Sequence, residues 1–78
     1  MNLPMQVIYT FPKNRHEQVK AYFQAYKGSN LVHLRVFDTA ADGTEQPTTK
    51  GIALRIDQLP QLHEAVEALV AAQEASSR

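Results

Sequence analysis

The sequence predicts an α+β domain in which four β-strands are followed by one C-terminal helix. Three observations predict it: apolar and polar residues alternate in several segments, turn-forming residues separate those segments, and the chain after Ile56 carries apolar residues at helical spacing. The 78 residues make a single domain, 1–78, that buries only about 60% of its unfolded surface. Because there is no cysteine to form disulfides, we expect a second subunit, in a homodimer, to supply further stability.

The first two strands are expected at residues 5–11 and 18–26. In the first, Val7, Tyr9 and Phe11 are predicted to share one side, and Pro12 ends the strand. In the second, the odd positions are apolar and the even positions are polar or tyrosine. A helix is the alternative for residues 18–26, because Gln, Lys and Ala are good helix formers. The turn sequence at residues 27–30 favours a hairpin instead.

The third and fourth strands are expected at residues 31–37 and 51–56. Their alternation places six apolar residues on one side, which are Val32, Leu34, Val36, Ile52, Leu54 and Ile56. The segment between them, residues 38–49, holds one glycine, one proline and no large apolar residue. We therefore expect residues 38–49 to form a loop.

The helix is expected at residues 58–73. Asp57 is a suitable N-cap, and Pro60 falls in the first turn, where its missing N–H costs nothing. Four apolar residues follow at spacings of three, four and three, and they form a stripe on one side: Leu59, Leu62, Val66 and Leu69. We expect this stripe to pack on the apolar side of the sheet and to form the dimer interface.

The charges divide the chain in two. Up to Ile56 there are seven basic and four acidic residues, a net charge of +3, and the remainder has a net charge of −3. The other sheet face is predicted to carry Lys20, Tyr22, Gln24, Tyr26, His33, Arg35 and Arg55. Rings among cations suit single-stranded nucleic acid, since bases stack on rings and phosphates need positive charge. The alternative is that Tyr22 and Tyr26 are ordinary cross-strand partners on a solvated sheet.

Other functional classes find little support. The three histidines do not have the spacing of a metal site, the three glycines form no phosphate-binding loop, and no serine has the partners of a catalytic triad. We expect no enzymatic activity and no cofactor. No stretch approaches the roughly 20 apolar residues of a membrane span, and the first ten residues do not resemble a signal peptide, so we expect a cytoplasmic protein.

From Tyr26 to Val66 the chain resembles the C-terminal domain of the transcriptional coactivator positive cofactor four and its bacterial relatives. The resemblance rests on an aromatic-Lys-Gly turn at residues 26–28, a strand ending in Arg35, an acidic turn at residues 42–43, and Pro47. The most specific piece is Lys50-Gly51-Ile52-x-Leu54 followed by the Gln-x-x-Gln-Leu start of a helix. It covers about half of the chain.

The resemblance implies a curved four-stranded antiparallel sheet with one helix, a dimer formed through the helices, and binding of single-stranded or unwound DNA on the concave sheet face. It implies that Tyr26 stacks on a base, that Lys27 and Arg35 contact phosphates, and that Lys50 is a basic contact. Four positions depart from the family pattern by lacking its cations or its stacking tryptophan: Ser29, Asp38, Gln46 and Thr49. From the alternation, independently of the family, we expect five residues to add contacts: Lys13, Arg15, Lys20, Tyr22 and Arg55.

The function we expect is that of a nucleoid-associated or coactivator-like transcription regulator that prefers single-stranded DNA. Two alternatives are left open. The segment from Gly51 to Leu69 also resembles a ribbon-helix-helix repressor, which would insert Ala53 and Arg55 into duplex DNA, but that fold needs a second helix. A protein-interaction module without nucleic-acid binding is the other alternative, with the helix stripe engaging a different protein.

Overall fold

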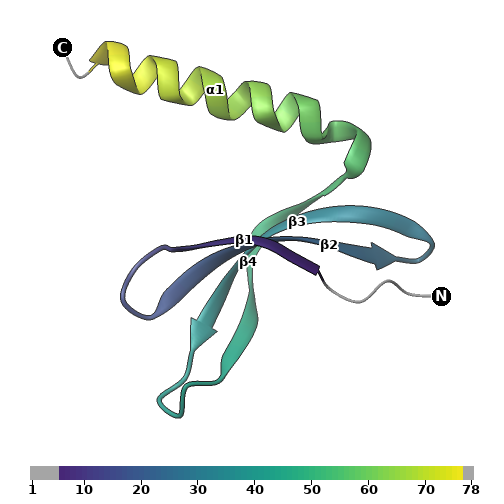
Figure 1. Cartoon of the computed structure of the whole chain (residues 1–78), viewed down its shortest axis with the longest axis vertical. Coiled ribbons are helices and arrows are strands. Elements are labelled where there is room, and N and C mark those ends of the chain that lie inside the picture. Colours follow the sequence, from purple (N-terminus) through teal and green to yellow (C-terminus); the bar gives the residue numbers. More distant parts are fainter. Residues whose placement is uncertain (1–5, 77–78) are drawn as a thin grey trace.

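The computed structural model describes residues 6–76 as a four-stranded antiparallel sheet followed by one helix (Figure 1). The strands are β1 (Gln6–Pro12), β2 (Glu17–Tyr26), β3 (Ser29–Thr39) and β4 (Glu45–Arg55), in the spatial order β1-β2-β3-β4. A 3-10 turn η1 (Ile56–Gln58) leads into α1 (Leu59–Ser76). The predicted fold class is therefore confirmed. Met5, the first residue of the first predicted strand, lies outside the described residues.

The register of β2, β3 and β4 confirms the predicted alternation. Phe23 lies opposite Val32, which lies opposite Leu54, so the predicted apolar residues share one side of the sheet. We call this side the Phe23 face, which comprises Val19, Ala21, Phe23, Val32, Leu34, Val36, Ile52 and Leu54. The opposite side is the Tyr22 face, and it includes Lys20, Tyr22, His33, Arg35 and Phe37.

Two local expectations were wrong. A bulge in β1 places Val7 opposite Tyr22 but Tyr9 opposite Ala21, so Val7 and Tyr9 lie on different sides of the sheet. Residues 38–49 do not form a loop, because most of them extend β3 and β4 into a hairpin whose turn is closed by Ala40 and Thr44. These strand ends are mostly exposed and therefore carry polar residues, so the pattern of apolar residues gave no sign that they pair.

The pairing of β3 with β4 also has a register shift, which lies between Arg35 and Phe37. Gly51 makes this shift possible. Gly51 lies opposite Arg35 with a positive φ of 148°. A Cβ atom there would collide with the Leu34 carbonyl oxygen and lie 2.8 Å from the Arg35 Cα. The Lys-Gly-Ile sequence therefore marks a close approach of two backbones that needs glycine.

The helix begins differently from the expectation that Asp57 is its N-cap. Asp57 lies inside η1, and the Gln58 side chain accepts a hydrogen bond from the Arg55 backbone N–H at 3.1 Å. Asp57 instead accepts a contact from the Arg55 side chain. Helix α1 then continues three residues beyond the predicted end, to Ser76. Among residues 6–76 there is no helix with the length and hydropathy of a membrane span.

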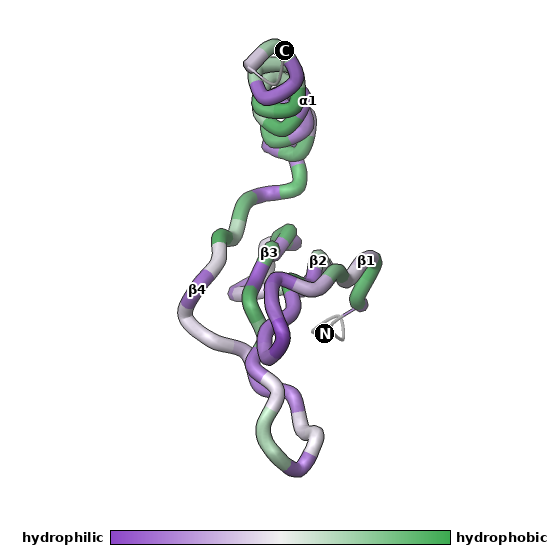
Figure 2. Tube along the Cα trace, turned by 90° about the vertical axis from the view of Figure 1, so that its left-hand side faces the viewer, coloured by the Kyte–Doolittle hydropathy of each residue, from purple (hydrophilic) through white to green (hydrophobic). Residues whose placement is uncertain are grey.

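Helix α1 extends away from the sheet, contrary to the expectation that its apolar stripe covers the apolar sheet face (Figures 1 and 2). None of its residues is buried, and Leu69 is 68% exposed. Apolar and polar residues alternate along the exposed helix in Figure 2. The stripe is thus unpartnered in the single chain, which leaves it available to a second subunit.

Burial is concentrated on both sides of the middle of the sheet. Among residues 6–76, the buried apolar residues are Tyr22, Val32, Val36 and Phe37. Val32 and Val36 belong to the Phe23 face, whereas Tyr22 and Phe37 belong to the Tyr22 face. The sheet therefore curls enough to bury aromatic rings on the side that was predicted to be outward.

Candidate nucleic-acid interface

Aromatic rings at the centre of the Tyr22 face pack against one another. The Tyr22 and His33 rings stack, with centroids 4.8 Å apart and planes 2° apart, and Phe37 meets Tyr22 edge to face at 6.1 Å. Tyr22 is only 4% exposed and Phe37 only 5%. The expectation that Tyr22 is an outward ring was therefore wrong, because the ring is buried against His33 and Phe37.

The His33 imidazole is unusual in this cluster. Both ring nitrogens are buried, and neither has a hydrogen-bond partner among the described residues. Burial lowers the pKa of His33, and the neighbouring Arg35 guanidinium lowers it further. His33 is consequently neutral at pH 7 and contributes an aromatic surface, without a positive charge, to the Tyr22 face.

Lys20 lies beside these rings and is already engaged by an acidic residue. Its Nζ atom is 2.8 Å from the Glu45 Oε1 atom and 5.0 Å from the centroid of Phe37. Lys20 belongs to β2 and Glu45 to β4, and β3 lies between these strands. The ion pair therefore spans β3, which requires the sheet to be concave on this side.

Arg35 is held by the backbone of β4. Its Nη1 atom donates a hydrogen bond to the Thr48 carbonyl at 3.0 Å, and the Thr48 hydroxyl donates to the Val36 carbonyl at 2.8 Å. These bonds fix the irregular pairing that Gly51 allows. Arg35 has no carboxylate within 4.0 Å in the part of the chain that the structure describes, so its charge remains available.

Tyr26 and Lys27 form an exposed pair at the turn between β2 and β3. Lys27 and Gly28 have positive φ values of 49° and 79°, the backbone of a tight two-residue hairpin turn. Tyr26 is 61% exposed, and the Lys27 Nζ atom lies 5.4 Å from its ring centroid. An exposed ring and a cation therefore lie side by side at this turn.

Lys13 and Lys50 converge on Glu17 at the opposite end of the sheet. Their Nζ atoms lie 3.6 Å and 3.4 Å from its carboxylate oxygens, and the Asn14 side chain donates to Glu17 at 2.7 Å. The Asn14 hydrogen bond, with the two lysines, lowers the pKa of Glu17 below its usual 4.5. Strand alternation places Glu17 on the side of Val19, so the carboxylate that holds these lysines lies on the Phe23 face, at the end of the sheet.

The remaining predicted contacts lie at the two ends. Arg55 pairs with Asp57 at 3.4 Å, and both side chains are largely exposed. Arg15 is exposed in the turn between β1 and β2. Strand β2, with 10 residues at about 3.3 Å each, spans about 30 Å, so the cations follow the full length of the sheet.

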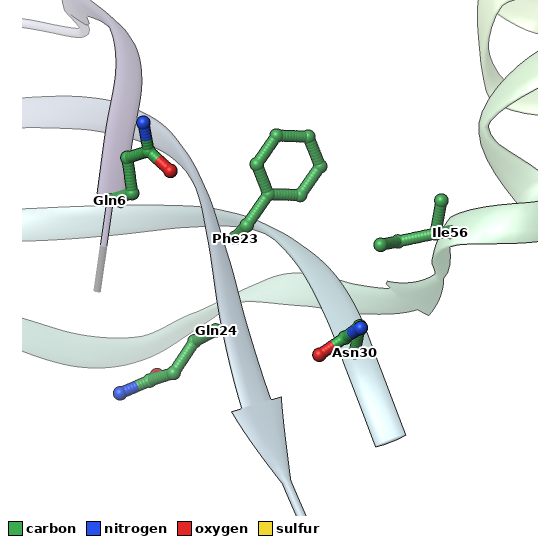
Figure 3. Close-up of a pocket in the computed structure, with 5 residues that line it drawn as sticks. All are labelled: Gln6, Phe23, Gln24, Asn30 and Ile56. Carbon is green, nitrogen blue, oxygen red and sulfur yellow. The ribbon is translucent and has the colours of Figure 1, made fainter. Parts of the chain in front are cut away.

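The predicted dimer residues line the exposed helix. Leu59 and Leu62 are half-buried near η1, whereas Val66 and Leu69 are 47% and 68% exposed. A pocket of about 260 Å³ is lined by Ile56, the first residue of η1, and by Gln6, Phe23, Gln24 and Asn30. In Figure 3 the Phe23 and Ile56 side chains approach each other across it. Apolar surface thus lies open on the helix and beside the sheet.

Four residues important to this site were missed in the sequence. Thr48 holds Arg35, Phe37 lies under Lys20, and the acidic side chains of Glu17 and Glu45 neutralise basic residues. Lys20 and Glu45 are 25 residues apart, so no local pattern connects them. Within residues 6–76 no group of three or more metal-binding side chains occurs.

Comparison with known proteins identifies several relatives. The family described as Transcriptional Coactivator p15 (PC4) matches residues 13–65. The structure resembles the crystal structure of BPSL1147, a PC4 homolog from Burkholderia pseudomallei, in its orthorhombic form, with a TM-score of 0.77, 26% identity, and 90% of this chain and 92% of that chain covered. The tetragonal form gives a TM-score of 0.76 at 25% identity, covering 88% and 98% of the two chains.

A bacteriophage T5 homolog of the eukaryotic transcription coactivator PC4, implicated in recombination-dependent DNA replication, shares the fold. Its TM-score is 0.73 at 19% identity, with 92% of this chain and 83% of that chain covered. No curated protein sequence matched this chain. The ribbon-helix-helix alternative is wrong for the fold, because β4 pairs with β3 in a four-stranded sheet.

Proposed function

This chain belongs to the Transcriptional Coactivator p15 (PC4) family, and on that premise we propose that it binds single-stranded or unwound DNA on its Tyr22 face. The observation that carries the proposal is the exposed Tyr26 ring beside the Lys27 ammonium, on the same sheet as the unpaired Arg35 guanidinium. An exposed ring offers stacking to a base, and the two cations offer contacts to phosphates.

The cations extend this contact along the strand. Lys27 and Arg55 lie at one end of the sheet, Lys20 and Arg35 lie in its middle, and Lys13, Arg15 and Lys50 lie at the other end. A chain of phosphates on the Tyr22 face would pass Arg55, Arg35 and Lys20, and it would reach Lys13 and Lys50 by rounding the end of the sheet, because their shared partner Glu17 lies on the Phe23 face. The protein would act on DNA in the cytoplasm, at the nucleoid, as a coactivator-like or nucleoid-associated factor without catalysis or a cofactor.

The affinity we propose is moderate. Ser29, Asp38, Gln46 and Thr49 replace cations or the ring of the family pattern, and carboxylates already pair with Lys13, Lys20, Lys50 and Arg55. Each phosphate contact contributes to a salt-dependent affinity, so fewer available cations give weaker binding and a shallower salt dependence.

We further propose that two copies form a dimer through α1. The helix stripe is exposed, and apolar groups beside Phe23 and Ile56 are also uncovered (Figure 3). A single 78-residue chain whose helix covers nothing has little core, and burying these surfaces against a second copy would stabilise both. The dimer would also bring two Tyr22 faces into one molecule.

A titration with poly-dT and with a duplex, each at two salt concentrations, tests the nucleic-acid proposal. We expect tighter binding to poly-dT than to duplex. For poly-dT, each phosphate contact should lower the affinity by about 0.7 logarithmic units for a tenfold increase in salt concentration. Absence of binding to both ligands would favour the protein-interaction module. Sequence-dependent binding to duplex over poly-dT would contradict the single-strand preference.

A further inference from the structure

The Lys20–Glu45 ion pair lies on the Tyr22 face itself. Its Nζ to Oε1 distance is 2.8 Å, and the two side chains are 16% and 34% exposed. Glu45 lies opposite Thr39, which alternation places on the same side as Phe37. A carboxylate thus occupies the position from which a DNA phosphate would approach the Lys20 ammonium.

The position of Lys20 does not depend on Glu45 alone. Its ammonium also lies 5.0 Å from the Phe37 ring centroid, and Phe37 is fixed against Tyr22. The cation–π contact favours the same location for the ammonium when the carboxylate is absent. Removing Glu45 would therefore leave a positioned cation on the face, with its charge uncompensated.

We propose that Glu45 is an affinity-determining residue that competes with DNA phosphate for Lys20. In the free protein, Glu45 satisfies the ammonium. On binding, a phosphate takes its place, and the released carboxylate returns to solvent. The exchange of one anion for another lowers the net gain from the Lys20 contact, so only a ligand that engages several other cations displaces Glu45 efficiently. This inference rests on the proposed function of the same face.

A double-mutant cycle on poly-dT binding tests the competition. Glu45→Gln should tighten binding about two- to fivefold at low salt, which corresponds to the energy of an exposed ion pair. It should also make the slope of log affinity against log salt concentration steeper by about 0.7, the value for one additional phosphate contact. Lys20→Met keeps the apolar stem over Phe37 and removes the charge. In the Lys20→Met background, Glu45→Gln should have no effect, because no cation remains to be released.

Asp38→Asn is the matched control for the loss of one negative charge. Asp38 lies in the same hairpin, opposite Gln46, and alternation places it on the other side of the sheet from Glu45. We expect it to change affinity less than Glu45→Gln does. Thermal unfolding of each variant checks that the fold is retained.

The possible outcomes separate the two proposals. Failure of the unmodified protein to bind poly-dT would overturn the proposed function and this inference with it. If the protein binds but Glu45→Gln matches Asp38→Asn, the inference alone is overturned. A tighter Glu45→Gln variant whose gain persists with Lys20→Met would also overturn it, since the carboxylate would then act by general repulsion of phosphate.

Discussion

The His33 imidazole stacks on the Tyr22 ring with the two planes 2° apart and the centroids separated by 4.8 Å. The two residues are direct register partners on β2 and β3, so the stack bridges the central strands. It joins two rings that the alternation had placed on the outward side of the sheet, and the Tyr22 ring is buried in this stack. The Tyr26 ring stays exposed and is the ring that we propose for stacking on a base.

Tyr22 and Tyr26 should therefore respond in opposite ways to truncation. Tyr22→Ala should lower the free energy of unfolding by about 3 kcal/mol, because it removes a buried ring from a small core. Tyr26→Ala should leave stability nearly unchanged and weaken poly-dT binding by about 1–3 kcal/mol with little change in salt dependence. Urea unfolding and DNA titration of both variants measure the contrast. Equal stability losses would indicate that Tyr26 is a cross-strand packing residue.

His33 should make the fold sensitive to mild acid. Its pKa is lowered in the folded state, first by burial and then by Arg35, so the unfolded chain binds the proton more readily. Stability is therefore fully present above the unfolded value of about 6.5 and falls as the pH decreases through the lowered folded value. Urea unfolding between pH 7.5 and pH 5 measures this loss. His33→Gln should show a smaller loss over the same range.

The Glu17 pKa predicts a second loss of stability at lower pH. Because Asn14 and the two lysines lower that pKa, the stabilisation is present above the usual value of 4.5 and disappears as pH falls through the lowered value. Glu17→Gln should remove this acidic step and leave the His33 step intact. A Glu17→Gln variant that loses as much stability at low pH as the unmodified protein, in the same urea-unfolding measurement, would contradict the assignment.

Gly51→Ala should disrupt the β3–β4 pairing. The added methyl group would collide with the Leu34 carbonyl, in addition to the strain of a positive φ, so we expect a loss of about 2 kcal/mol or more in unfolding free energy. Gly43→Ala is the control, because Gly43 also has a positive φ but has open space around its Cβ position. If Gly51→Ala lowered the unfolding free energy no more than Gly43→Ala does, the β3 and β4 backbones would be shown to move apart and accommodate the methyl group.

Leu69→Glu should prevent the proposed dimer. The substitution places a charge at the C-terminal end of the apolar stripe, and burying it in an interface would be costly. Sedimentation at micromolar concentration should then show a monomer. Gln61→Glu makes the same charge change outside the stripe and should leave the dimer intact. A dimeric Leu69→Glu variant would place the interface elsewhere.

Much of the fold was predictable because its signals are local. Strand alternation in β2 and β3 gave the correct faces for Phe23 and Val32, and the spacing of Leu59 to Leu69 gave the helix. The hairpin at residues 38–49 was missed because its strands carry polar residues, which resemble a loop in sequence. The bulge at Val7 also leaves no sign in an alternating pattern.

The sequence by itself determined that strands precede one helix, the side on which each residue of β2 and β3 lies, and the concentration of basic residues before the helix, since these follow from period and composition. Only the tertiary structure decided which rings and cations are accessible. Curvature of the sheet buries Tyr22 and brings Lys20 of β2 to Glu45 of β4, across the strand between them. Such contacts depend on register, bulges and curvature over many residues, so they cannot be predicted from local periodicity.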